Sequence, residues 1–394
     1  LAGTCNGFSN MVTTVTVGWL ALELTGSPLG VGLVLGSRAI PRLFLAAPIG
    51  AASDYRDRRR MLQGANLMGV ALALSAAAIA FLGWLTFPIL LVIAILEGAF
   101  DVAETTVKKA YLCDVVGRRD LVNGMTLEEM GNKITGVLGA LVAGFALARL
   151  GATGPFLFMA LGFLAGAAVL QRAPVSAWSP RPDGPRIALP RRGLALLARN
   201  RALLSVVAIT ITAEILLFSS EVLLPSFARD VLEVDEIGLG TMGSVRNLGS
   251  VIGLLLLAVL SKWLRPGPLL LWTTGAFAAA LIVFSVMTSY SGALVILLLV
   301  GMAFASVDAL QPALVQQNVA DSERGAAVGV WNLARGLGPL GNIEIGLIAA
   351  TLGTPMAQML NASLALVVVI MVVLLQRRFG FSLSADRHKP MQEA

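Results

Sequence analysis

Apolar stretches long enough to cross a membrane recur along almost the whole chain, and Gly, Pro or charged residues separate them. An α-helix needs about 20 consecutive apolar residues to cross the hydrocarbon core of a bilayer. The pattern therefore predicts an all-α membrane protein with about twelve transmembrane helices. The predicted spans are residues 1–23, 29–52, 62–84, 87–112, 122–149, 153–171, 202–228, 237–262, 267–288, 291–316, 325–350 and 355–376.

The composition excludes an ordinary soluble domain. The 394 residues are 57% hydrophobic and 13% charged, and the mean hydropathy is +0.82, whereas soluble domains carry about 25% charged residues. Lipid, in place of water, accounts for so many apolar side chains. Residues 1–22 are long enough to span the bilayer and lead directly into the next span, so we interpret them as a transmembrane helix and not as a cleaved signal peptide.

The basic residues indicate how the chain is oriented. They gather in the loops after every second predicted span and in the C-terminal tail, whereas Arg149 and Arg229 are the basic residues expected on the opposite side. The positive-inside rule then places both termini in the cytoplasm. We expect a multi-pass protein of a bacterial inner (cytoplasmic) membrane. Because the positive charges are confined to short loops, the net charge of +6 indicates membrane orientation and not a nucleic-acid partner.

A polar segment near the middle divides the chain. The first part of residues 172–201 is rich in proline, which favours an extended conformation. Residues 191–199 then have the pattern of a short basic amphipathic helix lying on the inner leaflet. We predict an N-terminal six-helix bundle over 1–171, a cytoplasmic linker with an amphipathic helix over 172–201, a C-terminal six-helix bundle over 202–376 and a cytoplasmic tail over 377–394.

The two halves repeat the same residue types at matching places. In a glycine-rich chain one match can arise by chance, but three matches in corresponding spans favour an internal duplication. We therefore predict two pseudo-symmetric six-helix bundles. The matches are Gly30, Gly32 and Arg38 with Gly238, Gly240 and Arg246; Phe100 and Glu104 with Phe304 and Asp308; and Gly124, Gly131 and Gly136 with Gly329, Gly336 and Gly341.

The loop between the second and third predicted spans carries the sharpest motif. Its glycine permits close helix approach, and its acidic residue ends a helix where several arginines can pair with it. Such a charge cluster can hold one conformation and release in another, whereas the simpler interpretation is a basic cytoplasmic loop. This loop resembles the signature loop of the major facilitator superfamily. The candidate latch residues are Gly50, Asp54, Arg58, Arg59 and Arg60.

Other segments are similar to the branch of that superfamily that contains enterobactin exporters and macrolide efflux proteins. They are residues 22–28, 324–335 and 336–341. The resemblance covers nearly the whole chain and implies the two-bundle fold, secondary transport and proton-driven export of small amphipathic compounds of the drug or siderophore class by alternating access. Residues 122–149 lack the Gly-Pro pair of the drug-antiporter motif, and the second-half copy of the signature loop, residues 260–265, lacks its acidic residue.

Ionisable side chains inside the spans are costly in a membrane and are candidates for function. On span 87–112, Glu97, Asp101, Glu104 and Lys108 fall within an arc of about 60° at about 100° per residue, so they form one stripe. The stripe must line a central cavity or contact a neighbouring helix. Because clustered carboxylates repel each other, we expect at least one to hold a proton near neutral pH, first Asp101 and then Glu104 and Glu97.

Basic side chains inside the spans are candidate partners of these acids. We expect them to neutralise buried carboxylates, although Arg38 and Arg246, at equivalent repeat positions, also suit an anionic group of a substrate. A purely structural ion-pair network of the stripe with Lys108, Lys133 and Arg38 is the alternative to proton coupling. Lys133 follows Glu129 by four residues and so also suits a local helix pair. The charge partners are Arg38, Lys108, Lys133, Arg246 and Arg335.

The remaining candidates lie on other spans. Glu214 is near the middle of span 202–228, and Asp308 is the repeat partner of Glu104, so the acids of the second half are a second coupling site or a relic of duplication. A mild polar stripe at helical spacing on the first span suits a cavity wall. It consists of Asn6, Asn10 and Thr13.

Familiar enzyme motifs do not occur in the sequence. The single histidine, His388, lies in the tail, and no phosphate-binding loop, metal-binding histidine pair or nucleophile elbow is present. We therefore expect a non-enzymatic monomer without a cofactor or metal, whose partners are a small-molecule substrate, protons and the bilayer. The alternative that stays open is a lipid, lysolipid or divalent-cation transporter of the same fold.

Overall fold

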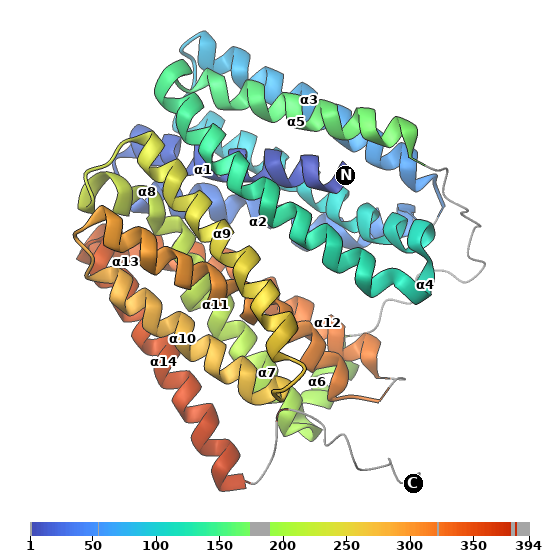
Figure 1. Ribbon diagram of the computed structural model, residues 1–394. Coiled ribbons are helices and arrows are strands. Elements are labelled where there is room, and N and C mark those ends of the chain that lie inside the picture. The colour runs from blue at the N-terminus through green and yellow to red at the C-terminus, as the bar shows by residue number, and fades with distance from the viewer. Residues whose placement is uncertain (1, 54, 174–189, 321–322, 380–382, 384–394) are drawn as a thin grey trace.

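The computed structural model describes residues 2–53, 55–173, 190–320, 323–379 and 383 (Figure 1). In this part of the chain the regular secondary structure is helical and no strand occurs. The elements are α1 (Ala2–Thr25), α2 (Pro28–Ser53), α3 (Arg58–Phe81), α4 (Phe87–Leu150), α5 (Thr153–Arg172), α6 (Pro190–Arg199), α7 (Arg201–Thr212), η1 (Ala213–Leu217), η2 (Phe218–Leu223), α8 (Leu224–Ser226), η3 (Phe227–Val231), α9 (Glu236–Leu260), α10 (Pro266–Ser285), α11 (Tyr290–Gln317), α12 (Arg324–Arg335), α13 (Gly338–Leu352) and α14 (Thr354–Phe379).

The predicted all-α membrane fold with about twelve spans is confirmed. Every predicted span falls on one of these helical segments, within a few residues of its expected bounds. Among the described residues, nine helical segments are long and apolar enough to cross a membrane. The three other predicted spans are α1, the first part of α4 and the α12–α13 pair, which carry many of the polar side chains discussed below.

Two predicted spans lie within α4, because this helix doubles back on itself. The Lys108 Nζ lies 2.8 Å from the Glu128 Oε1. In a straight helix, residues at this separation would be about 30 Å apart. The chain must therefore reverse between these residues, as the predicted boundary between spans 87–112 and 122–149 requires.

The spans predicted over 202–228 and 325–350 are not single regular helices. The first is α-helical as far as Thr212 and then passes through two π turns, a 3₁₀ turn and a short α turn. Pro225 is the second residue of that short α turn, and a proline cannot donate a backbone hydrogen bond. The second is interrupted after Arg335, and the chain becomes helical again at Gly338, the first residue of α13, which Pro339 follows. The continuous helices expected from the apolar runs are thus corrected to broken ones.

The peripheral and central helices of the two halves occupy matching places. In Figure 1, α3 and α5 lie side by side at one edge of the molecule, and α10 and α14 lie at the opposite edge. Between them, α2 packs against α13, and α4 packs against α9. These two helix pairs join the halves.

Glycines allow the close approach at both of these junctions. A Cβ added to Gly240 on α9 would lie 2.6 Å from the Ala140 carbonyl oxygen and 3.0 Å from the Gly144 Cα on α4. On the other junction, a Cβ added to Gly32 would overlap the Asn342 carbonyl oxygen of α13 and lie 3.4 Å from the Gly346 Cα. Gly32 and Gly240 are repeat partners, so the duplicated glycines serve as packing surfaces between the halves.

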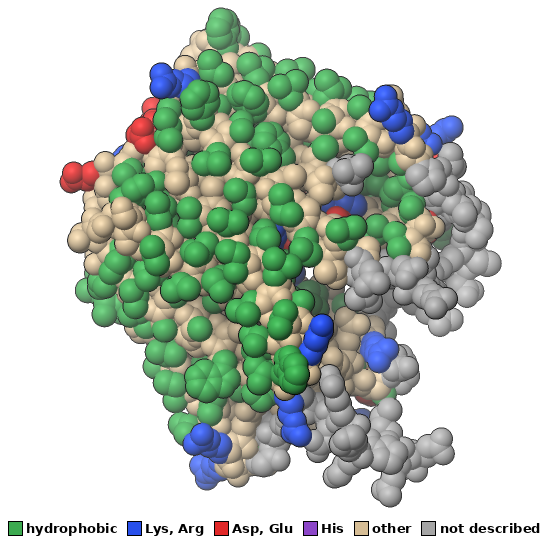
Figure 2. Space-filling model, viewed as in Figure 1, with side chains coloured by type: hydrophobic (Ala, Val, Ile, Leu, Met, Phe, Trp, Pro, Cys, Tyr) green, Lys and Arg blue, Asp and Glu red, His purple; other side chains and the backbone are tan. Residues whose placement is uncertain are grey.

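The halves share an apolar core at one end of the molecule only. One buried cluster combines Leu22 and Val31 of the first half with Leu223, Phe227 and Ile345 of the second. We call this the closed end; it contains the connections at residues 26–27 and 232–235. At the opposite end, here called the open end, separate clusters occur in the second half and in the first. Figure 2 shows the surface hollowed between the parts that carry α4 and α12.

The predicted amphipathic helix of the linker is present as α6. Gly193 on α6 is buried, and a Cβ there would lie 2.9 Å from the Ala326 carbonyl oxygen of α12. The helix therefore packs against the second half. The rest of the linker at 174–189, and most of the tail, lie outside the described residues. The domain boundaries stay predictions.

Two helix crossings repeat between the halves. A Cβ added to Gly98 on α4 would overlap the carbonyl oxygen of Arg38 on α2, and a Cβ added to Gly301 on α11 would overlap that of Arg246 on α9. Arg38 and Arg246 are the residues that the sequence repeat matches. The duplicated arginine positions thus mark the same crossing in each half, and the glycines that meet them differ by one residue from the register of Phe100 with Phe304.

We predict that Gly98→Ala and Gly301→Ala each destabilise the protein by roughly 1–3 kcal/mol, because the added methyl group meets rigid backbone and forces the helices apart. Thermal unfolding of the purified protein, followed by tryptophan fluorescence, measures the effect. The matched control is Gly64→Ala on α3, where an added Cβ meets nothing within 4 Å. Equal melting temperatures for Gly98→Ala and Gly64→Ala would contradict the close crossing.

Candidate functional site

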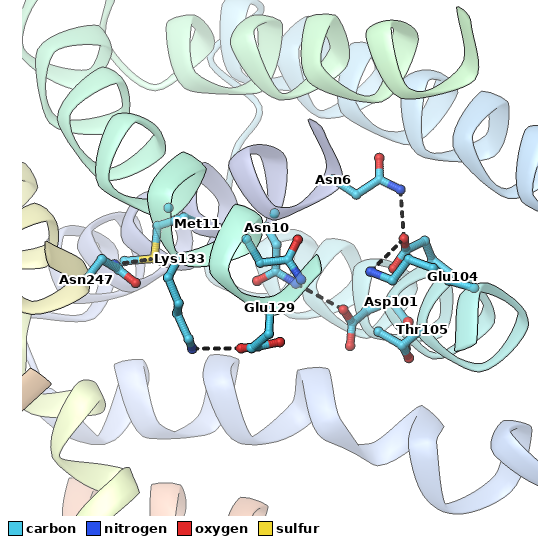
Figure 3. A pocket seen from close by; sticks show the side chains of 13 residues that line it. Asn6, Asn10, Met11, Asp101, Glu104, Thr105, Glu129, Lys133 and Asn247 are labelled. Carbon is cyan, nitrogen blue, oxygen red and sulfur yellow. Dashed lines mark hydrogen bonds and ion pairs between the residues drawn. The ribbon is translucent and has the colours of Figure 1, made fainter. Parts of the chain in front are cut away.

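The acidic stripe of α4 faces the polar stripe of α1, and the two stripes pair residue by residue. Asn6 Nδ2 donates a hydrogen bond to Glu104 Oε1 at 2.9 Å. Asn10 Nδ2 donates to Asp101 Oδ1 at 3.0 Å, as Figure 3 also shows. Thr13 Oγ1 donates to Glu97 Oε2 at 3.3 Å. The two predicted stripes are therefore one hydrogen-bonded ladder between helices that are distant in sequence.

The three acids of the ladder differ in access to water. Glu97 and Glu104 are 2% and 4% exposed, whereas the Asp101 side chain is 20% exposed. One oxygen of Glu97, Oε1, is buried without a hydrogen-bond partner. Asp101, the acid that we expected first to hold a proton, is thus the acid of this ladder that water reaches most easily.

A cavity of about 230 Å³ lies beside the ladder (Figure 3). Asp101 and Glu104 line it, whereas Glu97 is packed away from it. The stripe therefore contacts a neighbouring helix along its length and lines the cavity with two of its three acids. The lining residues are Asn6, Gly7, Asn10, Met11, Asp101, Glu104, Thr105, Lys108, Glu129, Asn132, Lys133, Gly136 and Asn247.

Lysines and an arginine balance the charge of the acids. Lys108 Nζ lies 3.0 Å from Glu104 Oε1 and 2.8 Å from Glu128 Oε1, so it joins the two arms of α4. Arg42 Nη2 on α2 lies 3.1 Å from Asp101 Oδ2. Asp101 is therefore held by α1 on one oxygen and by α2 on the other.

Two other predicted partners also have contacts. Lys133 Nζ lies 3.4 Å from Glu129 Oε1, which is the local pair that the spacing suggested. Arg38 Nη1 donates a hydrogen bond to Thr14 Oγ1 of α1 at 2.8 Å. Both basic side chains thus belong to the polar layer around the ladder.

The second half contains its own cluster of charges. Arg335 Nε on α12 donates to Glu214 Oε1 at 3.0 Å, and Arg335 Nη2 lies 3.3 Å from Asp308 Oδ1. Arg335 thus bridges the two acids predicted for this half. Asn6 and Glu214 each lie 24 residues before the paired glycines Gly30 and Gly238, so the same repeat position contacts the acidic cluster in both halves.

Glu221 and Glu214 have different partners, although a regular helix would place them on about the same face. The π and 3₁₀ turns between the two residues change the spacing. Glu221 Oε1 instead lies 2.9 Å from Arg246 Nη1. Glu344 on α13 accepts a hydrogen bond from Asn361 Nδ2 at 2.9 Å.

Phe304 on α11 connects the two polar systems. Lys133 Nζ of the first half lies 5.1 Å from its ring centroid, and Arg246 Cζ of the second half lies 4.8 Å from it. Cations at such distances are attracted to the face of an aromatic ring. Phe304 therefore connects Lys133 of α4 to Arg246, which pairs with Glu221.

At the open end, the candidate latch residue Arg58 pairs with an acid of α4. Arg58 Nη1 donates to the two carboxylate oxygens of Asp114 on α4 at 2.7 and 2.8 Å. Asp57 caps α3 by accepting hydrogen bonds from the backbone of Arg59 and Arg60. Asp54 lies outside the described residues.

The other latch residues have more ordinary contacts. Arg59 Nε donates to the Leu170 carbonyl oxygen of α5 at 2.8 Å, and Arg60 Nε lies 3.6 Å from Asp57 Oδ2. A Cβ on Gly50 would meet only Thr106 Cγ2, at 3.8 Å. The expected close helix approach at Gly50 is therefore wrong, since a side chain would fit there.

Sequence reasoning missed several residues of the site. They are far in sequence from their partners, and a single sequence without homologues offers no signal that joins them. Glu128 is the one member of this group that a local pattern could have indicated, because it precedes Glu129 in the span that also contains Lys133. The residues missed are Asp57, Asp114, Glu128, Asn132 and Asn247.

Lys108→Met is expected to destabilise the protein strongly, by about 3–5 kcal/mol, because it leaves Glu104 and Glu128 without their shared cation. The neighbouring variant Lys109→Met is the control, since the Lys109 side chain is exposed. Thermal unfolding in the same detergent compares the two. A Lys108→Met protein as stable as Lys109→Met would show that the ion pairs do not hold α4 folded back.

Comparison with known proteins agrees with this architecture. The chain is 27% identical over 371 residues to the multidrug efflux pump Tap of Mycolicibacterium fortuitum, covering 88% of this chain and 87% of the relative. It is 25% identical over 371 residues to the enterobactin exporter EntS of Salmonella choleraesuis, covering 90% and 82%. The inward-open structure of the xylose transporter XylE from E. coli superimposes with a TM-score of 0.73 at 14% identity, covering 99% and 96%.

The family follows from a direct match. Residues 1–341 match the model of the Major Facilitator Superfamily. The resemblance inferred from the loop motif is thereby confirmed, including the similarity to enterobactin exporters. The fold and these relatives are those of membrane transporters and not of enzymes. The chain is therefore a multi-pass membrane transporter that belongs to the Major Facilitator Superfamily.

Proposed function

We propose that this transporter is a proton-coupled exporter of small amphipathic compounds of the drug or siderophore class. The observation that carries the proposal is the ladder between α1 and α4, in which Asp101 and Glu104 line a cavity. Carboxylates inside a membrane protein are costly and are retained where a charge must change during function. The names of the relatives, an efflux pump and an exporter, support the direction of transport.

Asp101 is the residue through which a proton would change the structure. Its carboxylate accepts a hydrogen bond from Asn10 on α1 and pairs with Arg42 on α2. Both contacts are made to the carboxylate oxygens of Asp101. Protonation removes the attraction for Arg42, so α2 is released from α4 on the side of the cavity. Loss of the proton restores the contact.

Movement of α2 would change how the halves meet, because α2 packs against α13 of the second half. The halves share a core at the closed end and have separate cores at the open end. Alternating access requires these two ends to exchange roles. With the orientation given by the positive-inside rule, the open end faces the cytoplasm of a bacterium, both termini lie there, and the described conformation is open to the inside.

The acids of the second half have a different place in this proposal. Arg335 bridges Glu214 and Asp308, so each acid is paired with the same cation. Asp101 also pairs with an arginine, but it lines the cavity beside the ladder, whereas Glu214 and Asp308 do not. We therefore assign these residues to holding α12 against α11 and η1, and we assign proton binding to the first half.

Asp101→Asn is expected to abolish proton movement coupled to substrate, because an amide cannot gain or lose the proton. In proteoliposomes with a pH-sensitive dye in the lumen, adding a transported compound to the unmodified protein should change the lumenal pH. The variant should give no such change. Glu104→Gln should weaken it, since Glu104 is also tied to Lys108.

Glu344→Gln is the matched control for this experiment. Glu344 is an acid on α13 that does not line the cavity and accepts a hydrogen bond from Asn361, which a glutamine can also accept. Its pH signal should equal that of the unmodified protein. Unchanged signals in Asp101→Asn, Glu104→Gln and Glu97→Gln would contradict a proton role of α4. Tight divalent-cation binding lost in these variants would favour a cation carrier instead.

A further inference from the structure

A group of arginines gathers at the open end of the second half, away from the transport cavity. Arg199 ends α6, Arg201 begins α7, and Arg377 and Arg378 lie in the last turn of α14. All four side chains are exposed. Three segments that are far apart in sequence thus bring positive charge to one place.

Packing fixes part of this group. Arg201 Cζ lies 4.8 Å from the ring centroid of Phe379, and Arg378 Cζ lies 5.8 Å from the same centroid. Between α6 and α7, Asn200 Nδ2 donates to the Asn318 carbonyl oxygen at 2.7 Å, and its side chain caps α7. The turn that carries Arg199 and Arg201 is therefore anchored to the end of α11, and Arg201 also contacts Phe379.

A cavity of about 420 Å³ lies at this turn. Its lining holds two arginines and one acid, Glu323, and within the described part of the chain no carboxylate pairs with Arg199 or Arg201. Such arginines present several N–H donors in a planar fork, a geometry that suits the oxygens of a phosphate group. The lining residues are Leu196, Arg199, Asn200, Arg201, Ala202 and Glu323.

We propose that this cavity binds a phosphate group, supplied by an anionic phospholipid of the surrounding leaflet. Leu196 and Ala202 give the cavity an apolar side that a free anion would not need. Leu204, one turn further along α7, is 48% exposed, and Phe379 is 50% exposed. These side chains can contact acyl chains, while the arginines hold the headgroup.

The position of the cavity gives a bound lipid a structural effect. It joins the end of the linker helix α6 to the first turn of α7, and α6 in turn packs against α12. A phosphate shared by Arg199 and Arg201 would tie the linker to the second half. The bound lipid is therefore expected to stabilise the protein as well as to occupy the cavity.

Native mass spectrometry of the full chain, released from nanodiscs of phosphatidylglycerol and phosphatidylcholine, tests the proposal. We expect retained phosphatidylglycerol, with the affinity lowered about fivefold by Arg199→Gln and again by Arg201→Gln, since each basic side chain near a membrane surface attracts anionic lipid. Glu323→Gln should raise the affinity, because it removes the one repelling charge of the lining.

Arg172→Gln at the end of α5 is the control, because Arg172 is an exposed arginine of the first half outside the cavity. It should leave binding unchanged. Arg201→Lys keeps the charge but loses the planar fork, so it should bind more weakly than the unmodified protein and more tightly than Arg201→Gln. Circular dichroism and gel filtration identify any variant that is unfolded.

Inorganic phosphate, added to protein in pure phosphatidylcholine nanodiscs, separates the two sources of the phosphate group. No rise in melting temperature is expected with it, whereas phosphatidylglycerol should raise the melting temperature of the unmodified protein and not that of Arg201→Gln. If inorganic phosphate raises the melting temperature of the unmodified protein but not that of Arg201→Gln, the cavity binds phosphate, and the proposal that a lipid supplies it is wrong. Equal lipid retention in Arg199→Gln, Arg201→Gln and Arg172→Gln would overturn the site.

Discussion

The hydrogen-bonded pairing of the α4 carboxylates with α1 is the interaction on which the rest of the structure depends. An ionised carboxylate inside a membrane is stable only if donors and counter-charges surround it. Asn6, Asn10 and Thr13 supply the donors, and Lys108 and Arg42 supply the charges. Because Lys108 also reaches Glu128, the same acids hold the two arms of α4 together. The polar layer therefore determines how three helices of the first half are placed.

The second half uses the same positions with different chemistry. Glu214 takes the place of Asn6, and Asp308 takes the place of Glu104. Two acids then face each other where the first half has an amide and an acid, and Arg335 bridges them. The first half thus keeps an acid, Asp101, whose surroundings include a cavity, while the second half has a fixed cation between its acids. In the proposed function, this duplicated frame with unequal charges gives the two halves separate tasks.

The glycines show the same division between frame and chemistry. Gly32 and Gly240 allow the halves to meet, and Gly98 and Gly301 allow the matching helix crossings within each half. Glycine has no side chain, so at these positions the backbones of two helices come close together. The two halves share this close packing, whereas their polar residues differ. The closed end is built on this frame, and the open end carries the ion pair of Arg58 with Asp114.

The sequence by itself determined the all-α membrane fold, the approximate spans, the repeat and the two polar stripes, because long apolar runs and helical spacing act locally. It also pointed to Glu214, Asp308 and Arg335 as charged residues inside spans. Only the tertiary structure decided which groups meet: Asn10 with Asp101, Arg58 with Asp114, and Arg335 with two acids. It also decided that Glu97 lies outside the cavity and that the span after Arg201 is broken. These outcomes depend on how helices rotate and cross in space, and the spacing of residues along one chain carries no measure of that.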